Sequence, residues 1–146
     1  MSIFIVLVGI AVLILVHELG HFIVAKFFGV KVEEFGFGFP PRLWSKKIGE
    51  TTYSVNALPF GGFVRLLGEN PELPVPEAER HRSFSSQQVW RRALIVVAGV
   101  LMNFMLGWLL TFFIFFICVP QRLFVASVVP GSPAAIAGIM SGDQVE

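Results

Sequence analysis

Three ionisable residues lie inside one long apolar stretch, and their position constrains this chain more than any other feature of its sequence. The stretch covers residues 3–28 and contains His17, Glu18 and His21. An ionisable side chain at the centre of a bilayer costs about 2.5–3.5 kcal/mol on insertion scales, so such residues are usually functional. On a helix, positions i and i+4 share a face, which would place the two histidines side by side. The sequence therefore predicts a helix that carries a polar site within an apolar surface.

The pattern His-Glu-x-x-His on a helix is a zinc signature. Neutral imidazole nitrogens bind Zn²⁺ at about 2.0–2.1 Å, and a carboxylate beside the site can act as a general base. We therefore expect His17 and His21 to be zinc ligands and Glu18 to be the catalytic base. A five-residue pattern also arises by chance, but the apolar surroundings favour the functional interpretation.

The composition is typical of a membrane protein, with 55% hydrophobic residues and a mean hydropathy of +0.75. A second apolar stretch covers residues 93–119, and both stretches exceed the roughly 20 residues that cross a bilayer. The first lacks the basic start and cleavage site of a signal peptide, so we expect a retained helix. A net charge of +1 gives no indication of a nucleic-acid partner, and the single Cys118 excludes a disulfide within the chain.

The basic residues predict how the two helices are oriented. All lysines and arginines except Arg122 lie at or between the facing ends of the two apolar stretches. Loops that carry such an excess of positive charge remain on the cytoplasmic side. We therefore expect a cytoplasmic central segment, with both ends of the chain on the opposite side of the membrane.

The segment between the two stretches has the features of a small antiparallel sheet. Residues 51–58 are strand-like, residues 48–50 have turn chemistry, and glycines and aromatic residues alternate over residues 35–39. Two interpretations remain open. The sheet could dip into the membrane and pair its edge with a substrate strand, or it could be an ordinary cytoplasmic hairpin.

The remaining segments give weaker expectations. Residues 83–92 are amphipathic and suit the membrane interface, after a polar loop. Gly99, Asn103 and Gly107 form a stripe that should pack on the first helix, although Asn103 could instead orient a substrate or stabilise an oxyanion. Pro120 should end the second helix. In the tail we expect a strand over residues 124–129, followed by a short helix with Ser132 as its N-cap.

Four segments, taken in order, resemble the site-2 protease family of intramembrane zinc metalloproteases, and most closely its bacterial regulator-of-sigma-E protease group. The resemblance covers nearly the whole chain. The similar segments are residues 17–21 (HELGH), residues 37–39 together with 58–64, residues 92–104, and residues 129–143.

The resemblance implies a membrane α-helical fold with a small β element. Its parts would be a first transmembrane helix (1–29), a membrane re-entrant β-loop (30–67), a cytoplasmic loop with an interfacial segment (68–92), a second transmembrane helix (93–120) and the truncated start of a PDZ domain (121–146). It also implies Zn²⁺-dependent cleavage of the transmembrane segments of single-pass membrane proteins, of the anti-sigma factor or remnant signal peptide type, in the bacterial inner membrane. The residues expected to contact the substrate are Asn56, Pro59, Gly61, Gly62 and Asn103.

One departure from the family pattern limits this interpretation. The family takes its third zinc ligand from an aspartate in a Leu-Asp-Gly motif on a later helix, and that motif does not occur in this sequence. Asp143, the only aspartate, is expected on the opposite side of the membrane from the cytoplasm. We therefore expect an incomplete zinc site and no activity from the fragment as given. The alternatives are a noncatalytic membrane module that binds substrate and, less favoured because two helices make a poor conduit, a metal-transporting protein.

Overall fold

The computed structural model describes residues 2–118 and 123–145 of the chain. The chain divides into two compact units, Met1–Trp108 and Leu109–Glu146, which are described separately here. The first unit contains the helix with the His-Glu-x-x-His pattern, the sheet and most of the second long helix. The predicted end of the second helix at Pro120 lies outside the described residues.

The first helix, α1, spans Ser2–Phe27 and ends where the sequence predicts. Gly29 follows it with φ 74°, a left-handed conformation that glycine adopts without strain. The Gly29 amide donates to the carbonyl of Lys26, and the Val30 amide donates to that of Ala25. This is the Schellman arrangement, and Ala25 and Val30 are both fully buried beside it. The apolar stretch therefore ends in a fixed reversal that turns the chain toward the sheet.

The sheet consists of two long strands, β1 (Val32–Ile48) and β2 (Thr51–Leu66), paired antiparallel. Gly49, with φ 63°, provides the left-handed residue at the turn between them. Pairing starts at Ile48 opposite Thr51, which confirms the turn predicted over residues 48–50.

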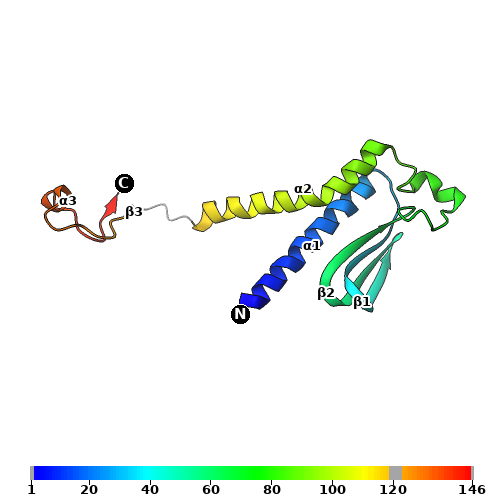
Figure 1. The fold of residues 1–146 in the computed structure, drawn as a ribbon, viewed down its shortest axis with the longest axis horizontal. Coiled ribbons are helices and arrows are strands. Elements are labelled where there is room, and N and C mark those ends of the chain that lie inside the picture. The colour runs from blue at the N-terminus through cyan, green and yellow to red at the C-terminus, as the bar shows by residue number, and fades with distance from the viewer. Residues whose placement is uncertain (1, 119–122, 146) are drawn as a thin grey trace. The chain divides into compact units, whose positions relative to one another are not determined.

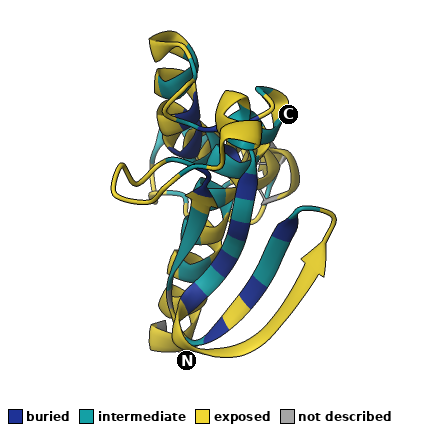
Figure 2. Cartoon of the chain, turned by 90° about the vertical axis from the view of Figure 1, so that its right-hand side faces the viewer, coloured by how far each residue is buried: buried dark blue, intermediate teal, exposed yellow. Residues whose placement is uncertain are grey.

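The first part of β1 is flanked by β2 on both sides. Phe35, for example, lies opposite both Val64 and Tyr53. The side chains of β1 alternate between buried and half-buried positions up to Gly38, as the period of two in a strand requires. From residue 39 to residue 49 every residue is exposed (Figure 2). The sheet therefore has a packed base near the end of α1 and an outer segment that is largely exposed.

One buried carboxylate within the sheet is compensated by charge. Glu34 is 4% exposed, and it accepts hydrogen bonds from Arg42 and from the Ser54 hydroxyl at 2.7 Å. Arg65 lies 3.2 Å from its other oxygen. A buried charge without partners is costly, so Glu34 favours a fold that keeps all three partners close. Through Glu34, Arg42 of the outer segment of β1 is linked to Ser54 and Arg65 in the two halves of β2.

The second long helix, α2, spans Val89–Phe113, and a π-helical stretch continues from Ile114 to Cys118. It begins four residues before the expected membrane span at 93, so Arg91 and Arg92 lie in the first turn of the same helix. Arginine loses little rotamer freedom in a helix, so it can end an apolar stretch without ending the helix. Both α1 and α2 are long and apolar enough to cross a membrane. A short 3₁₀ helix, η1 (Glu77–Arg82), lies in the loop before α2.

The core of the first unit lies where the two helices and the base of the sheet meet (Figure 1). Ala25, Val30, Val32, Leu66 and Ile95 form its buried cluster. Phe22 extends it along α1 through an edge-on contact with the Phe35 ring, at 5.3 Å between centroids. This core fixes the last two turns of α1 against both α2 and the sheet.

The second unit contains β3 (Leu123–Phe124), α3 (Pro133–Ile136) and β4 (Gln144–Val145), with β3 and β4 paired antiparallel. Ser132 caps α3 as predicted, because its hydroxyl accepts from the Ala135 amide. The strand expected over residues 124–129 is wrong beyond Phe124. Val125 still donates to the Asp143 carbonyl and accepts from the Gly142 amide, both at 2.8 Å, but residues 126–129 are not paired as a strand within the described part of the chain.

Candidate functional site

The two motif histidines share one face of α1, as their spacing predicts. The ring centroids of His17 and His21 are 4.8 Å apart, and the rings are nearly perpendicular, at 81°. Both side chains are half-buried. The apolar helix therefore presents two imidazoles together to its neighbour.

That neighbour is α2, which approaches the histidines through a glycine. A Cβ placed on Gly99 would lie 2.5 Å from His21 Nε2 and 2.7 Å from His17 Nε2. The two Nε2 atoms thus face the same point, and only a residue without a side chain leaves that point open. The predicted packing of Gly99 on the first helix is confirmed, whereas a Cβ on Gly107 would meet no atom within 4 Å. Of the two glycines in the stripe, Gly99 is the one at which an added Cβ would meet α1.

A second glycine brings the two backbones together beside the histidines. A Cβ on Gly20 would lie 2.5 Å from the carbonyl oxygen of Ala98 and 2.8 Å from Met102 Cγ. Gly20 and Ala98 are both buried. Small residues at a helix crossing permit this separation, and it places the face of α2 directly against the motif.

The tautomer of His21 follows from its contact with α2. His21 Nδ1 lies 2.7 Å from the carbonyl oxygen of Ile95. A carbonyl can only accept, so Nδ1 carries the proton and Nε2 has a free lone pair. A hydrogen bond of this kind orients metal-binding imidazoles in many proteins. This contact could not be predicted from the sequence, because the acceptor is a main-chain atom 74 positions away.

Glu18 lies on a different side of α1, next to the sheet. A Cβ on Gly62 of β2 would lie 3.0 Å from Glu18 Cγ. Glu18 and His21 also line a cavity of about 240 Å³, together with side chains from β2 and α2. Its other lining residues are Val64, Leu66, Glu69, Phe84, Ile95 and Val96. The carboxylate and one imidazole therefore border a space large enough for water and a small part of a peptide.

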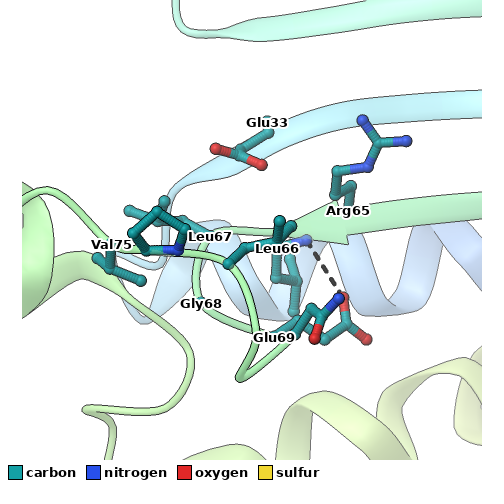
Figure 3. Close-up of a pocket in the computed structure, with 10 residues that line it drawn as sticks. Glu33, Arg65, Leu66, Leu67, Gly68, Glu69 and Val75 are labelled. Atoms are coloured by element: carbon teal, nitrogen blue, oxygen red, sulfur yellow. Dashed lines mark hydrogen bonds between the residues drawn. The ribbon is translucent and has the colours of Figure 1, made fainter.

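A larger cavity of about 460 Å³ lies on the loop side of the first (Figure 3). Leu66 and Glu69 line both cavities. The Glu69 carboxylate accepts from the Leu66 amide at 3.3 Å, which folds the loop back on the end of β2. Glu69 is exposed, so a carboxylate accessible to solvent stands between the loop and the space beside Glu18. Sequence reasoning missed Glu69 because nothing near it in the sequence distinguishes it from other loop carboxylates.

The residues expected to contact a substrate are in different environments. Asn56 is buried, and its amide donates to the Gly38 carbonyl at 2.9 Å, so it is engaged within the sheet. Pro59 is exposed, and Gly61, with φ 122°, packs against the Phe39 ring. Asn103, one turn beyond Gly99 on α2, has a buried side-chain oxygen without a hydrogen-bond partner. Gly62 lies against a motif residue, because a Cβ there would meet Glu18.

A charged cluster holds the far end of α1. Glu50, in the hairpin turn, pairs with Lys26 Nζ at 2.6 Å and with Arg82 Nη1 at 2.8 Å. Hydrogen bonds from Arg82 and then Lys26 lower the pKa of Glu50 from its ordinary 4.5 to about 2, and the same contact raises the pKa of Arg82. The cluster links the end of α1, the tip of the hairpin and η1.

His17, His21 and Glu18 are chemically suited to part of a zinc site. Two imidazoles with Nε2 atoms facing one point, one of them in the metal-binding tautomer, suit Zn²⁺, and a carboxylate lies beside them. Within residues 2–118 and 123–145, no group of three or more His, Cys, Asp or Glu side chains is gathered in one place. A catalytic zinc commonly has three protein ligands, and the described residues bring two candidate ligands together.

Comparison with known proteins agrees with this chemistry. The chain is 44% identical over 144 residues to a Clostridium perfringens protein provisionally named a zinc metalloprotease. It is 44% identical over 135 residues to a similarly named protein of Thermotoga maritima, and 41% identical over 143 residues to the regulator of sigma-E protease RseP of Escherichia coli. These matches cover 99%, 89% and 96% of this chain, but only 42%, 26% and 31% of the three relatives. The model of peptidase family M50 matches residues 5–141, and the chain therefore belongs to that family.

Proposed function

We propose that this chain provides the histidine-bearing part of an intramembrane zinc endopeptidase. The observation that carries the proposal is the closeness of the two Nε2 atoms to one point beside Gly99, with the Nδ1 atom of His21 held by the Ile95 carbonyl. The names of the relatives and the family support zinc as the metal. In this proposal His17 and His21 hold the ion, and a third ligand comes from outside the described residues.

The proposed chemistry divides between the metal and the protein. Bound zinc would supply Lewis-acid polarisation of the scissile carbonyl. Glu18 accepts a proton from the attacking water and returns it to the leaving amine, as a general base and then a general acid. The cavity beside Glu18 can hold that water. Glu69 lines the same cavity and provides a polar group along the route by which water would enter from the loop side.

The sheet is proposed to act as a membrane re-entrant β-loop that presents the substrate. Exposed apolar side chains on its outer segment, such as Leu43 (69%) and Trp44 (53%), favour a lipid or substrate environment over water. Gly62 beside Glu18 lets an extended peptide approach the carboxylate closely. In this scheme Pro59, Gly61 and Gly62 border the peptide, Asn56 shapes the strand from within, and the unpaired Asn103 oxygen is available to a peptide amide.

Location and substrate are proposed from the same features. Two helices able to cross a membrane and a family of proteases suit an inner-membrane protein that cleaves transmembrane segments of single-pass proteins. The central loop would then be cytoplasmic, both ends of the chain would lie on the other side, and residues 121–146 would begin a PDZ domain. The second candidate is a noncatalytic module that binds such substrates, which two gathered ligands, rather than three, would suit.

Glu18→Gln distinguishes the two candidates. In the native protein purified from its own membrane, the variant should retain zinc and lose about 10²–10⁴-fold in cleavage rate, because the metal ligands stay and the base is removed. Zinc content and cleavage of a labelled single-pass segment are measured together. Unchanged cleavage by the variant would refute the protease assignment, and no zinc in the wild-type protein would favour the binding module.

A further inference from the structure

A cationic cavity of about 480 Å³ lies where the end of α1 meets the beginning of α2, and neither His17 nor His21 lines it. Its polar lining residues are His81, Arg82, Ser86, Gln87, Gln88 and Arg91, and none of its lining residues is acidic. Phe28, directly after α1, and Trp90 of α2 meet edge-on nearby, with ring centroids 5.4 Å apart. The cavity thus combines positive charge and hydrogen-bond donors at the shared end of two helices long enough to cross a membrane.

Arg91 is one of two half-buried cations in the described part of the chain without a carboxylate partner, and of these two it is the one that lines the cavity. Five lysines and arginines are half-buried in the described part of the chain. Lys26, Lys31 and Arg82 each pair with a glutamate, whereas Arg91 and Arg92 make no ion pair there. A partly buried charge is screened less by water than an exposed one, so a missing counter-ion costs more at these positions.

The Arg91 guanidinium is held in place by uncharged groups. It lies over the Phe28 ring at 5.6 Å and over the Trp90 ring at 5.3 Å from their centroids. Its Nη1 donates to Gln87 Oε1 at 3.2 Å, and its buried Nε has no hydrogen-bond partner. A planar cation fixed in this way is suited to bind a phosphate through paired hydrogen bonds.

Two further features favour an anion in this cavity. Gln88 precedes the first residue of α2, and the free amides and dipole at a helix N-terminus attract negative charge. Arg82 adds a second cation, although it is already shared with Glu50. Arg91 is therefore the residue that carries the argument.

We propose that this cavity binds a phosphate group, with Arg91 as its principal ligand. Tryptophan beside arginine at the end of an apolar helix is typical of the lipid headgroup region, so an anionic phospholipid is the favoured source and free phosphate is the other. The site does not include His17 or His21 and requires no catalysis, so its test is independent of the protease assignment.

The test uses the whole chain with Trp90 as its only tryptophan, made by Trp44→Phe and Trp108→Phe. The protein is placed in nanodiscs of phosphatidylcholine. In one arm phosphatidylglycerol replaces a rising share of the lipid, and in the other inorganic phosphate is added. Trp90 fluorescence is recorded for wild type, Arg91→Gln, Arg91→Lys and Arg80→Gln. Arg80 is a matched control because it is exposed, makes no described ion pair and does not line the cavity.

A saturable change in the wild type supports the proposal. A response to phosphatidylglycerol alone identifies a lipid headgroup, and a response to both identifies phosphate in general. Arg91→Gln should raise the half-saturation point about tenfold, as expected for one lost charge-assisted contact, while Arg80→Gln should leave it unchanged. The half-saturation point of Arg91→Lys should lie between those of the wild type and Arg91→Gln. No saturable wild-type response in either arm, or equal weakening by Arg80→Gln and Arg91→Gln, would overturn the proposal. If Arg91→Gln does not fold, the presence or absence of a saturable wild-type response, together with the Arg91→Lys result, still tests the proposal.

Discussion

Two regions of α1 are held by different means. The part of the helix around His17 and His21 lies against α2 through two glycines: Gly20 meets the Ala98 backbone, and Gly99 meets the two imidazoles. The end of the helix is held by side chains, through the Lys26–Glu50–Arg82 cluster. The first contact depends on shape and tolerates no added atom, whereas the second depends on charge and responds to pH. The candidate metal site is placed at the shape-dependent contact, which fixes geometry closely and is insensitive to salt.

The largest effect on stability is expected from Gly20→Ala. The added methyl would lie 2.5 Å from the Ala98 carbonyl oxygen, a backbone atom that can move only if the helices separate. Overpacking of this kind costs about 1–3 kcal/mol, so the thermal unfolding midpoint in detergent should fall. Gly9→Ala on the same helix is the control, because a Cβ there meets no atom within 4 Å. Equal midpoints for the two variants would contradict the shape-dependent contact.

Gly99→Ala should affect metal binding more than stability. The atoms that its methyl would meet are the Nε2 atoms of His17 and His21, which belong to side chains and can rotate away. Rotation would break the His21 contact with the Ile95 carbonyl and turn the ligand atoms from their common direction. Zinc affinity, measured by competition with a fluorescent chelator, should fall at least about tenfold. An unchanged affinity would show that the Nε2 atoms are not the ligand atoms.

The sequence predicted what depends on neighbouring residues. The end of α1 at Gly29, the hairpin turn at Gly49 and the Ser132 cap each follow from local backbone rules, and the structure confirms them. The shared face of His17 and His21 likewise follows from helical spacing. The helix α2 starts four residues before the predicted membrane span, because that prediction followed apolarity, and arginine interrupts apolarity without interrupting a helix.

Contacts between distant segments could not be predicted in the same way. The Ile95 carbonyl is a main-chain acceptor present at every position, so only the packing of α2 on α1 selects it. The placement of Gly62 beside Glu18 depends on the register of a strand 44 residues away in the sequence, and Glu69 reaches the cavity through a loop. A helix stripe predicts that small residues face a neighbour, but it does not say that Gly99 makes the close contact and Gly107 does not.

The charge-dependent region should respond to acid. The pKa of Glu50 is lowered to about 2 from 4.5, so its ionised form stabilises the folded state above about pH 4.5, and this contribution is lost as the pH falls toward 2. Glu50→Gln should lower stability near neutral pH by on the order of 1 kcal/mol and flatten the acid-induced loss. Unfolding midpoints are measured across this pH range. Glu72→Gln, at an exposed loop position, is the control, and an equal flattening by that variant would contradict the role of the cluster.

The smallest effect is expected at Gly107, and it limits how far the shape-dependent contact extends. Gly107 is on the same helix as Gly99 and, like Gly99, lies four residues from Asn103, but an added Cβ there meets no atom within 4 Å. Alanine is favoured over glycine within helices by about 1 kcal/mol, so Gly107→Ala should leave stability unchanged or raise it by no more than that amount. Zinc affinity should not change, because the variant is two helical turns from the position that faces the histidines. A loss of either property would mean that α1 and α2 stay in close contact beyond Asn103, and the site would then depend on a longer helix interface than the one around Gly20 and Gly99.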